Sequence, residues 1–207
     1  MFSFVGTSMV PCPTAEPGPW CATSPPGCQG DPVEGDDTLV LRAPRPSDEP
    51  VAREAQAALA ADGFDFGLRP DTEPWLAYLD RLQREHRGED LPPGRVASTY
   101  LYGEVAGRVV GRTSIRHTLT DTLRAEGGHI GYAVLPAERR RGYATAILRR
   151  SLEVARDLGI GRVLVTCRAD NVGSLAVIAR CGGRLDPEWP VNPHGPGGVP
   201  LRRFWID

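Results

Sequence analysis

One stretch of this sequence decides the fold: Val134-Leu135-Pro136-Ala137-Glu138-Arg139-Arg140-Arg141-Gly142-Tyr143-Ala144. It follows an apolar run, Ile130 to Val134, that predicts a strand, and it leads into a helical pattern. A tight turn from a strand into a helix leaves several backbone N–H groups unpaired, and the helix dipole adds partial positive charge there. Gly142 lets the backbone approach a ligand without a side chain in the way. The stretch therefore predicts a site for a phosphate or pyrophosphate at the start of the helix.

The three arginines of this turn, Arg139, Arg140 and Arg141, raise its positive potential and can reach outlying phosphates. The same run also fits a solvated first turn of a helix, or a nuclear-localisation or nucleic-acid patch. Neither alternative accounts for the strand before the turn and the helix after it. The helix is well specified, because apolar residues recur at helical spacing at Ala144, Ile147, Leu148, Leu152, Ala155 and Leu158.

A second strand and helix follow the first pair. The segment Arg162 to Cys167 is rich in β-branched residues and predicts a buried strand. A helix is predicted from Val172 to Arg180, and Asn171 is a suitable N-cap for it. The anion-binding turn therefore lies within a β–α–β unit.

These motifs resemble a known family. The order Arg139-x-x-Gly142-x-Ala144 is similar to the (Gln/Arg)-x-x-Gly-x-(Gly/Ala) signature of the GNAT superfamily of acyl-CoA-dependent N-acetyltransferases. Other stretches, in the same order, resemble an uncharacterised bacterial branch of that family: Ser114-Ile115-Arg116-His117, Gly127-Gly128-His129-Ile130-Gly131-Tyr132, Arg141-Gly142-Tyr143-Ala144-Thr145, Val165-Thr166-Cys167, Asn171-Val172-Gly173-Ser174, Gly182-Gly183 and Arg203-Phe204-Trp205-Ile206. The resemblance covers roughly Leu39 to Asp207. It implies an α/β (α+β) GNAT fold, with a mixed central sheet, splayed fourth and fifth strands, and helices on both faces.

The resemblance also implies the donor and its site. Acetyl-CoA is expected as the acyl donor, and no metal site is expected. In the family, the arginine-rich loop holds the pyrophosphate of coenzyme A, the Asn bonds the pantetheine arm, and the Ser can contact a phosphate. The cofactor-binding residues expected here are Val134, Arg139, Arg140, Arg141, Gly142, Tyr143, Ala144, Thr145, Asn171 and Ser174. Asn171 can cap its helix and also touch the cofactor.

The chemistry implied by the family is direct attack of a primary amine, from a small molecule or a peptide, on the acetyl thioester in a ternary complex. The thioester oxygen needs a donor, expected to be a backbone N–H near Tyr132 or Val134 on the fourth strand. Many members place a tyrosine seven residues after the Asn as the acid, but this position is Ile178 here. The general acid is therefore not assigned from the resemblance.

Three residues are expected as catalytic bases: Glu126, Tyr132 and His117. Glu126 is the first choice, because in the family the base is often a Glu at the start of the fourth strand. Side chains alternate along a strand, so Glu126 and Tyr132 would share one face. A structural hydrogen-bonding role for His117 and a core-packing role for Tyr132 remain open, as does a catalytically silent acyl-CoA-binding or interaction module.

Composition agrees with a globular enzyme. The chain has 207 residues, 41% apolar and 24% charged, and its net charge of −2 argues against general nucleic-acid binding. Residues 1–37 are rich in Pro and Gly and are expected to be a disordered tail, with the acetyltransferase domain over 38–207. No stretch approaches the roughly 18 apolar residues of a membrane helix. A cytoplasmic protein that does not bind membranes is expected, and a homodimer is left open.

The remaining elements follow from apolar periodicity and turn signals. A hairpin is expected around Ala106-Gly107, and the region Pro190 to Pro200 is expected to be a loop. The segment Leu119 to Glu126 is expected to be a loop or a short helix. The other predicted strands are Thr38–Ala43, Ala97–Gly103, Arg108–Arg116, one at Leu185 and Leu201–Ile206, and the other predicted helices are Asp48–Ala61 and Thr72–Arg87.

Overall fold

The computed structural model of the chain describes residues 39–60, 62–68, 70, 72–189, 191–192 and 198–207. All of them belong to one unit, Pro32–Asp207. The expected disordered tail, 1–37, lies outside the described residues. None of the described helices combines the length and the apolar run that are needed to cross a bilayer.

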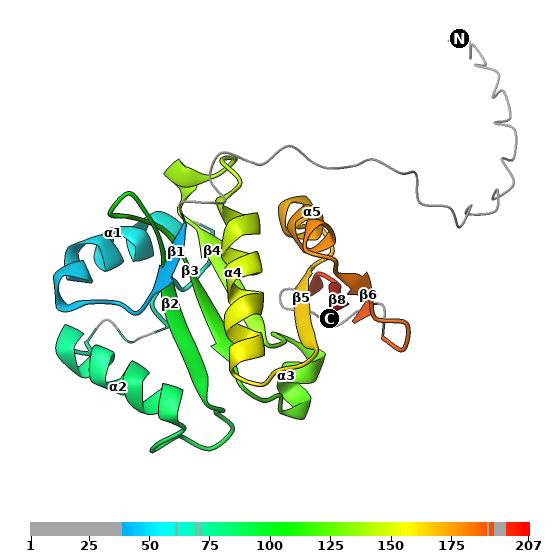
Figure 1. Cartoon of the computed structure of the whole chain (residues 1–207), viewed down its shortest axis with the longest axis horizontal. Coiled ribbons are helices and arrows are strands. Elements are labelled where there is room, and N and C mark those ends of the chain that lie inside the picture. The colour runs from blue at the N-terminus through cyan, green and yellow to red at the C-terminus, as the bar shows by residue number, and fades with distance from the viewer. Residues whose placement is uncertain (1–38, 61, 69, 71, 190, 193–197) are drawn as a thin grey trace, which may run out of the picture. The chain divides into compact units, whose positions relative to one another are not determined.

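The first half of the domain forms a four-stranded antiparallel sheet, sheet A (Figure 1). Its order is β1-β2-β3-β4, with bounds β1 (Val40–Arg42), β2 (Ser98–Val105), β3 (Arg108–Arg116) and β4 (Ile130–Val134). The predicted hairpin is confirmed, and its turn residues Ala106 and Gly107 both have positive φ, 48° and 77°. β3 and β4 have the predicted bounds, whereas β2 extends two residues further into the hairpin than expected.

The second half forms sheet B, also antiparallel, in the order β5-β8-β6, with β7 pairing with β8. Its strands are β5 (Val163–Arg168), β6 (Arg184–Leu185), β7 (Val191–Asn192) and β8 (Leu201–Ile206). β7 lies in the region expected to be a loop. The sheet divides between β4 and β5, where the splay was expected, so the described strands form two antiparallel sheets.

Helices lie on both faces of sheet A, as predicted (Figure 1). They are η1 (Pro46–Asp48), α1 (Glu49–Ala60), α2 (Trp75–Arg87), α3 (Asp121–Ala125), η2 (Pro136–Glu138), α4 (Tyr143–Asp157) and α5 (Val172–Arg180). α1 and α2 bury Tyr100 and Tyr102 on one face, and α4 buries Ile147 on the other. α2 begins three residues later than predicted, because Pro74 disfavours the helical conformation of Glu73 before it.

Sheets A and B are joined at one end of β4. The His129 N–H donates to the Leu164 carbonyl at 2.7 Å, and the Leu164 N–H donates to His129 Nδ1 at 2.9 Å. Gly128 has φ +62°, and a Cβ there would lie 2.5 Å from the Leu164 carbonyl oxygen. The junction therefore requires glycine both for its backbone conformation and for the close approach of β5.

Replacing Gly128 with Ala tests this constraint. We expect Gly128→Ala to lower the free energy of unfolding by about 2–4 kcal/mol, because left-handed strain and a backbone clash add together. Gly159 has φ +78° and open space around its Cβ position. Gly159→Ala therefore reports the left-handed strain alone, about 1 kcal/mol. If chemical denaturation showed the same loss of the free energy of unfolding in both variants, the junction would not be tight.

The pH dependence of stability tests His129. Burial, and then the charges of Arg124 and Arg116, lower the pKa of His129 from 6.5 to about 4. The unfolded chain therefore binds a proton between these values that the folded chain does not, so stability falls as the pH decreases from about 6.5 to about 4. The loss amounts to about 3 kcal/mol at most. In His129→Asn, whose Oδ1 can still accept the Leu164 N–H, this part of the pH dependence should disappear; an unchanged slope would contradict the assignment.

Candidate functional site

The open edge of β4 is the first part of the site. The Leu135 N–H donates to the Val110 carbonyl, and the Arg116 N–H donates to the His129 carbonyl. Backbone groups alternate in direction along a strand, so these two bonds fix which residues of β4 face β3. In the observed register, the N–H groups of Tyr132 and Val134 point away from β3, toward the splay. They can donate to a ligand that lies between the two sheets.

The turn after β4 contains the residues that were predicted to bind an anion. Gly142 is the N-cap of α4 and is left-handed, with φ 81°, and no side chain caps the helix. Within the described chain, the first capping bond comes from the Thr145 N–H, which donates to the Gly142 carbonyl at 3.0 Å, so the preceding amides have no acceptor. The unpaired N–H groups and the positive end of the helix dipole therefore meet at one point, as an anion requires.

The three arginines of this turn have different surroundings. Arg139 Nη2 lies 2.5 Å from Asp62 Oδ2, and its Nε donates to the Val134 carbonyl at 3.4 Å. Arg141 pairs with Glu138 at 3.1 Å. Arg140 is exposed and has no ion pair within the described residues. Among the three, Arg140 therefore has its guanidinium free to reach a phosphate.

Tyr132 bridges the splay. Its hydroxyl lies 2.9 Å from Ser174 Oγ on α5. Burial raises the pKa of Tyr132, so the phenol stays protonated at neutral pH. Burial also raises the pKa of the neighbouring Cys167 thiol on β5. A protonated phenol is suited to donate a proton or a hydrogen bond, and it is not suited to act as a base, which was one of the roles expected of Tyr132.

The start of α5 faces the same gap. The Asn171 side chain accepts the Ser174 N–H at 2.9 Å, so the predicted N-cap role is present. Ile178, at the position where many family members have a tyrosine, is fully buried. The hydroxyl that reaches α5 therefore comes from Tyr132 on β4. It contacts α5 at Ser174, one helical turn before Ile178.

The prediction that Glu126 and Tyr132 share one face of the fourth strand is wrong. Glu126 is the C-cap of α3 and is exposed, and β4 begins only at Ile130. The intervening Gly127 and Gly128 have φ of 107° and 62°, which breaks the alternation of side chains.

His117 lies beside Thr99 of β2 and His86 of α2. Its Nε2 is 2.8 Å from Thr99 Oγ1, which is also 2.8 Å from His86 Nδ1. Burial and the neighbouring His86 lower the pKa of His117. These contacts are those of a structural hydrogen-bonding residue, the alternative left open above.

The sequence analysis did not single out two arginines that lie beside β4. Arg112 and Arg116 approach β4 from the face that α1 and α2 cover, and a Cβ on Gly131 would lie 3.9 Å and 3.8 Å from their Nη1 atoms. Nothing in the local pattern distinguishes them from other strand arginines. No group of three or more His, Cys, Asp or Glu side chains that could hold a metal ion occurs in the described part of the chain.

Comparison with known proteins identifies the family. A sequence model of the acetyltransferase (GNAT) family matches residues 61–183, more than half of the chain. No match was found among curated proteins. The chain therefore belongs to the GNAT family, and it is an enzyme of the N-acetyltransferase class.

Solved acetyltransferase structures share the fold. RimJ of Mycobacterium smegmatis, in complex with CoA-disulfide, has a TM-score of 0.60 and 22% identity, covering 81% of this chain and 81% of its own. YncA of Salmonella typhimurium, a putative acetyltransferase with acetyl-CoA, has a TM-score of 0.57 and 16% identity, covering 82% and 94%. Spermidine N-acetyltransferase of Vibrio cholerae, with CoA and spermine, has a TM-score of 0.55 and 14% identity, covering 82% and 95%. The family and the fold expected from the sequence are confirmed.

Proposed function

We propose that this protein transfers an acetyl group from acetyl-CoA to a primary amine of a small molecule or peptide. The observation that carries the proposal is the open edge of β4, which leads directly to the uncapped N-terminus of α4. An elongated ligand with a reactive end and a pyrophosphate matches both features at once. Neighbouring folds that hold acetyl-CoA or CoA support the same donor here.

The donor would lie along β4 with its pyrophosphate at the start of α4. The amides from Gly142 to Ala144, which have no acceptor within the described chain, would bind the phosphate oxygens, and Arg140 would contribute a charge-assisted bond. Arg139 and Arg141 would act indirectly, since Asp62 and Glu138 already hold them. The amide of Asn171 would face the pantetheine arm while it caps α5.

The reaction would proceed by direct attack. The acceptor nitrogen, after losing one proton from its ammonium form, forms a bond to the acetyl carbonyl carbon, and the carbon–sulfur bond then breaks. The N–H of Tyr132 or Val134 would stabilise the oxyanion. The new amide loses the second proton, and the thiolate gains one from the Tyr132 hydroxyl, which Ser174 would reprotonate through solvent.

The initial deprotonation requires little from the protein. Glu126, the exposed C-cap of α3, could pass the proton to bulk water. A silent acyl-CoA-binding module remains the alternative, since Ile178 replaces the tyrosine of many relatives. Release of free thiol across a panel of amines separates the two, because a silent module binds acetyl-CoA without releasing thiol.

Acetyl-CoA affinity tests the donor site. We expect Arg140→Gln to weaken binding about tenfold in calorimetry, because one charge-assisted contact to phosphate is lost. Gly142→Glu should abolish measurable binding, since bulk and negative charge enter the anion site. Arg156→Gln, at an exposed arginine in the last turn of α4, is the matched control and should bind normally. Wild-type affinity in folded Gly142→Glu would place the donor elsewhere.

The turnover rate tests the proposed acid. Tyr132→Phe removes the hydroxyl and keeps the ring, so kcat should fall about 10²-fold, the low end for general acid catalysis, because a thiolate is a fair leaving group. The Kd for acetyl-CoA should stay within about twofold of wild type. Ser174→Ala leaves the phenol in place and should lower kcat less than Tyr132→Phe does. An unchanged kcat in Tyr132→Phe would give the role of acid to water.

A further inference from the structure

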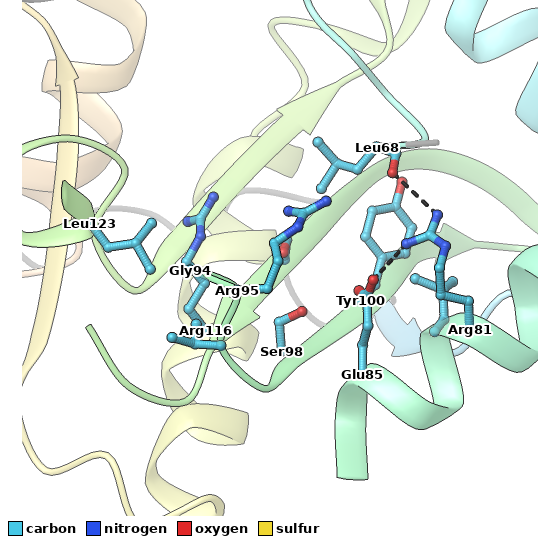
Figure 2. A pocket seen from close by; sticks show the side chains of 12 residues that line it. Leu68, Arg81, Glu85, Gly94, Arg95, Ser98, Tyr100, Arg116 and Leu123 are labelled. Atoms are coloured by element: carbon cyan, nitrogen blue, oxygen red, sulfur yellow. Dashed lines mark hydrogen bonds and ion pairs between the residues drawn. The ribbon is translucent and has the colours of Figure 1, made fainter. Parts of the chain in front are cut away.

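A small hollow opens on the face of sheet A opposite α4 (Figure 2). It has a volume of about 80 Å³ and lies between α2, the loop before β2, β3 and α3. Ser98 and Ser114 contribute hydroxyl groups from the sheet. The volume is far below the several hundred Å³ of a site for a whole drug-sized ligand. It suits the end group of a longer molecule.

The charges that line this hollow are unbalanced. Of its three arginines, Arg81 is neutralised by Glu73 and Glu85, at 2.8 Å and 2.6 Å. Arg95 and Arg116 have no carboxylate partner within the described residues. Figure 2 shows their side chains extending in the same direction, without an interaction with the other residues drawn. Two uncompensated positive charges therefore meet in one small space.

Arg116 is only partly used by the fold. Its Nη1 donates to the carbonyls of Gly127 and Gly128, at 3.2 Å and 3.1 Å. The described contacts leave Nε and Nη2 for another acceptor. Burial lowers the pKa of Arg116, and the charges of Arg112 and Arg95 add to this. A bound anion would relieve both the repulsion and the desolvation of this guanidinium.

Arg112 extends the positive field to β4. It is 4% exposed, and its Nη1 and Nη2 donate to the carbonyls of Gly131 and Asp65. Its Nε has no hydrogen-bond partner in the described structure. Burial lowers the pKa of Arg112, and the carboxylate of Asp65, whose charge acts to raise it, is exposed and accepts the Leu68 N–H. Arg112 and Arg116 therefore lie at Gly131 on the face of β4 that α1 and α2 cover, and the Tyr132 side chain lies on the opposite face.

We propose that this hollow binds a carboxylate carried by the acceptor, so that the substrate is an amine with its own acidic group. The inference rests on the proposed acetyl transfer and names its acceptor class. A carboxylate between Arg95 and Arg116 places the attached amine on the face of β4 that the donor does not occupy. The positive field of Arg95, Arg112 and Arg116 repels polycations. It also favours the neutral, nucleophilic form of the amine over its ammonium form.

The test uses acceptors in matched pairs. Glycine, β-alanine, γ-aminobutyrate and ε-aminocaproate vary the distance from amine to carboxylate, and each is paired with its carboxamide, which keeps the amine and loses the charge. Spermidine is the polycation. Thiol release from acetyl-CoA should show at least a tenfold larger kcat/KM for one or more acids than for the paired amide. Equal rates within every pair, or a preference for spermidine, would overturn the proposal.

Variants place the effect at the hollow. Arg95→Gln should raise KM for the preferred acid about tenfold, the loss of one charge-assisted bond, and should leave kcat and the KM of the carboxamide unchanged. Arg156→Gln, distant on α4, should change neither. An equal loss for acid and amide in Arg95→Gln would show that Arg95 supports the structure and does not bind the carboxylate.

A binding measurement separates this inference from the proposed function. If none of the acceptors releases thiol, acetyl transfer to these amines is rejected, but the hollow can still be tested. With CoA saturating, at least one of the acids should raise Tm more than its amide does, and Arg95→Gln should remove the difference. Identical Tm values for acid and amide in the wild-type protein would reject the carboxylate site itself.

Discussion

The close contact between Gly128 and Leu164 is the constraint on which the site depends. Two sheets meet there through His129, and beyond it β4 and β5 are no longer paired. A continuous sheet would satisfy the N–H groups of Tyr132 and Val134 with the next strand. The splay leaves these groups for a ligand, since a buried amide without a partner is costly. A stability element, the tight glycine junction, thus creates the opening that the chemistry uses.

The two faces of β4 differ in what they offer. On the side of α4 and α5 there are peptide N–H groups, a protonated phenol and a helix N-terminus, and Arg140 adds a full charge at the turn before α4. On the side of α2 there are full charges, Arg112 and Arg116, held close to Gly131. Dipoles bind a phosphate chain without a large desolvation cost, whereas unpaired guanidinium groups select for a compact anion. In the proposed function, this arrangement would separate donor from acceptor by chemistry as well as by position.

Sequence patterns predicted the helices and strands better than the long-range contacts of the candidate site, for a physical reason. β3, β4 and α5 have the predicted bounds because apolar periodicity and caps are local signals. The anion-binding turn is equally local. By contrast, Arg139 pairs with Asp62 across 77 residues, and Tyr132 reaches Ser174 across 42. The prediction that Glu126 shares a face with Tyr132 was wrong because Gly127 and Gly128, both with positive φ, rotate the chain between Glu126 and β4. Such partners depend on the folded register, which periodicity does not contain.

Arg116 belongs both to the junction between the sheets and to the hollow. One of its nitrogens holds the carbonyls of Gly127 and Gly128, so it supports the junction, and the rest of its guanidinium lines the hollow. Arg95 lies in an exposed loop before β2 and contributes nothing to the junction. If the hollow binds the acceptor as proposed, a change at Arg116 would disturb fold and specificity together, whereas a change at Arg95 would alter only the charge that the acceptor meets. In this proposal, acceptor preference can vary through Arg95 while the junction and the donor site stay intact, because Arg95 makes none of the described contacts of either.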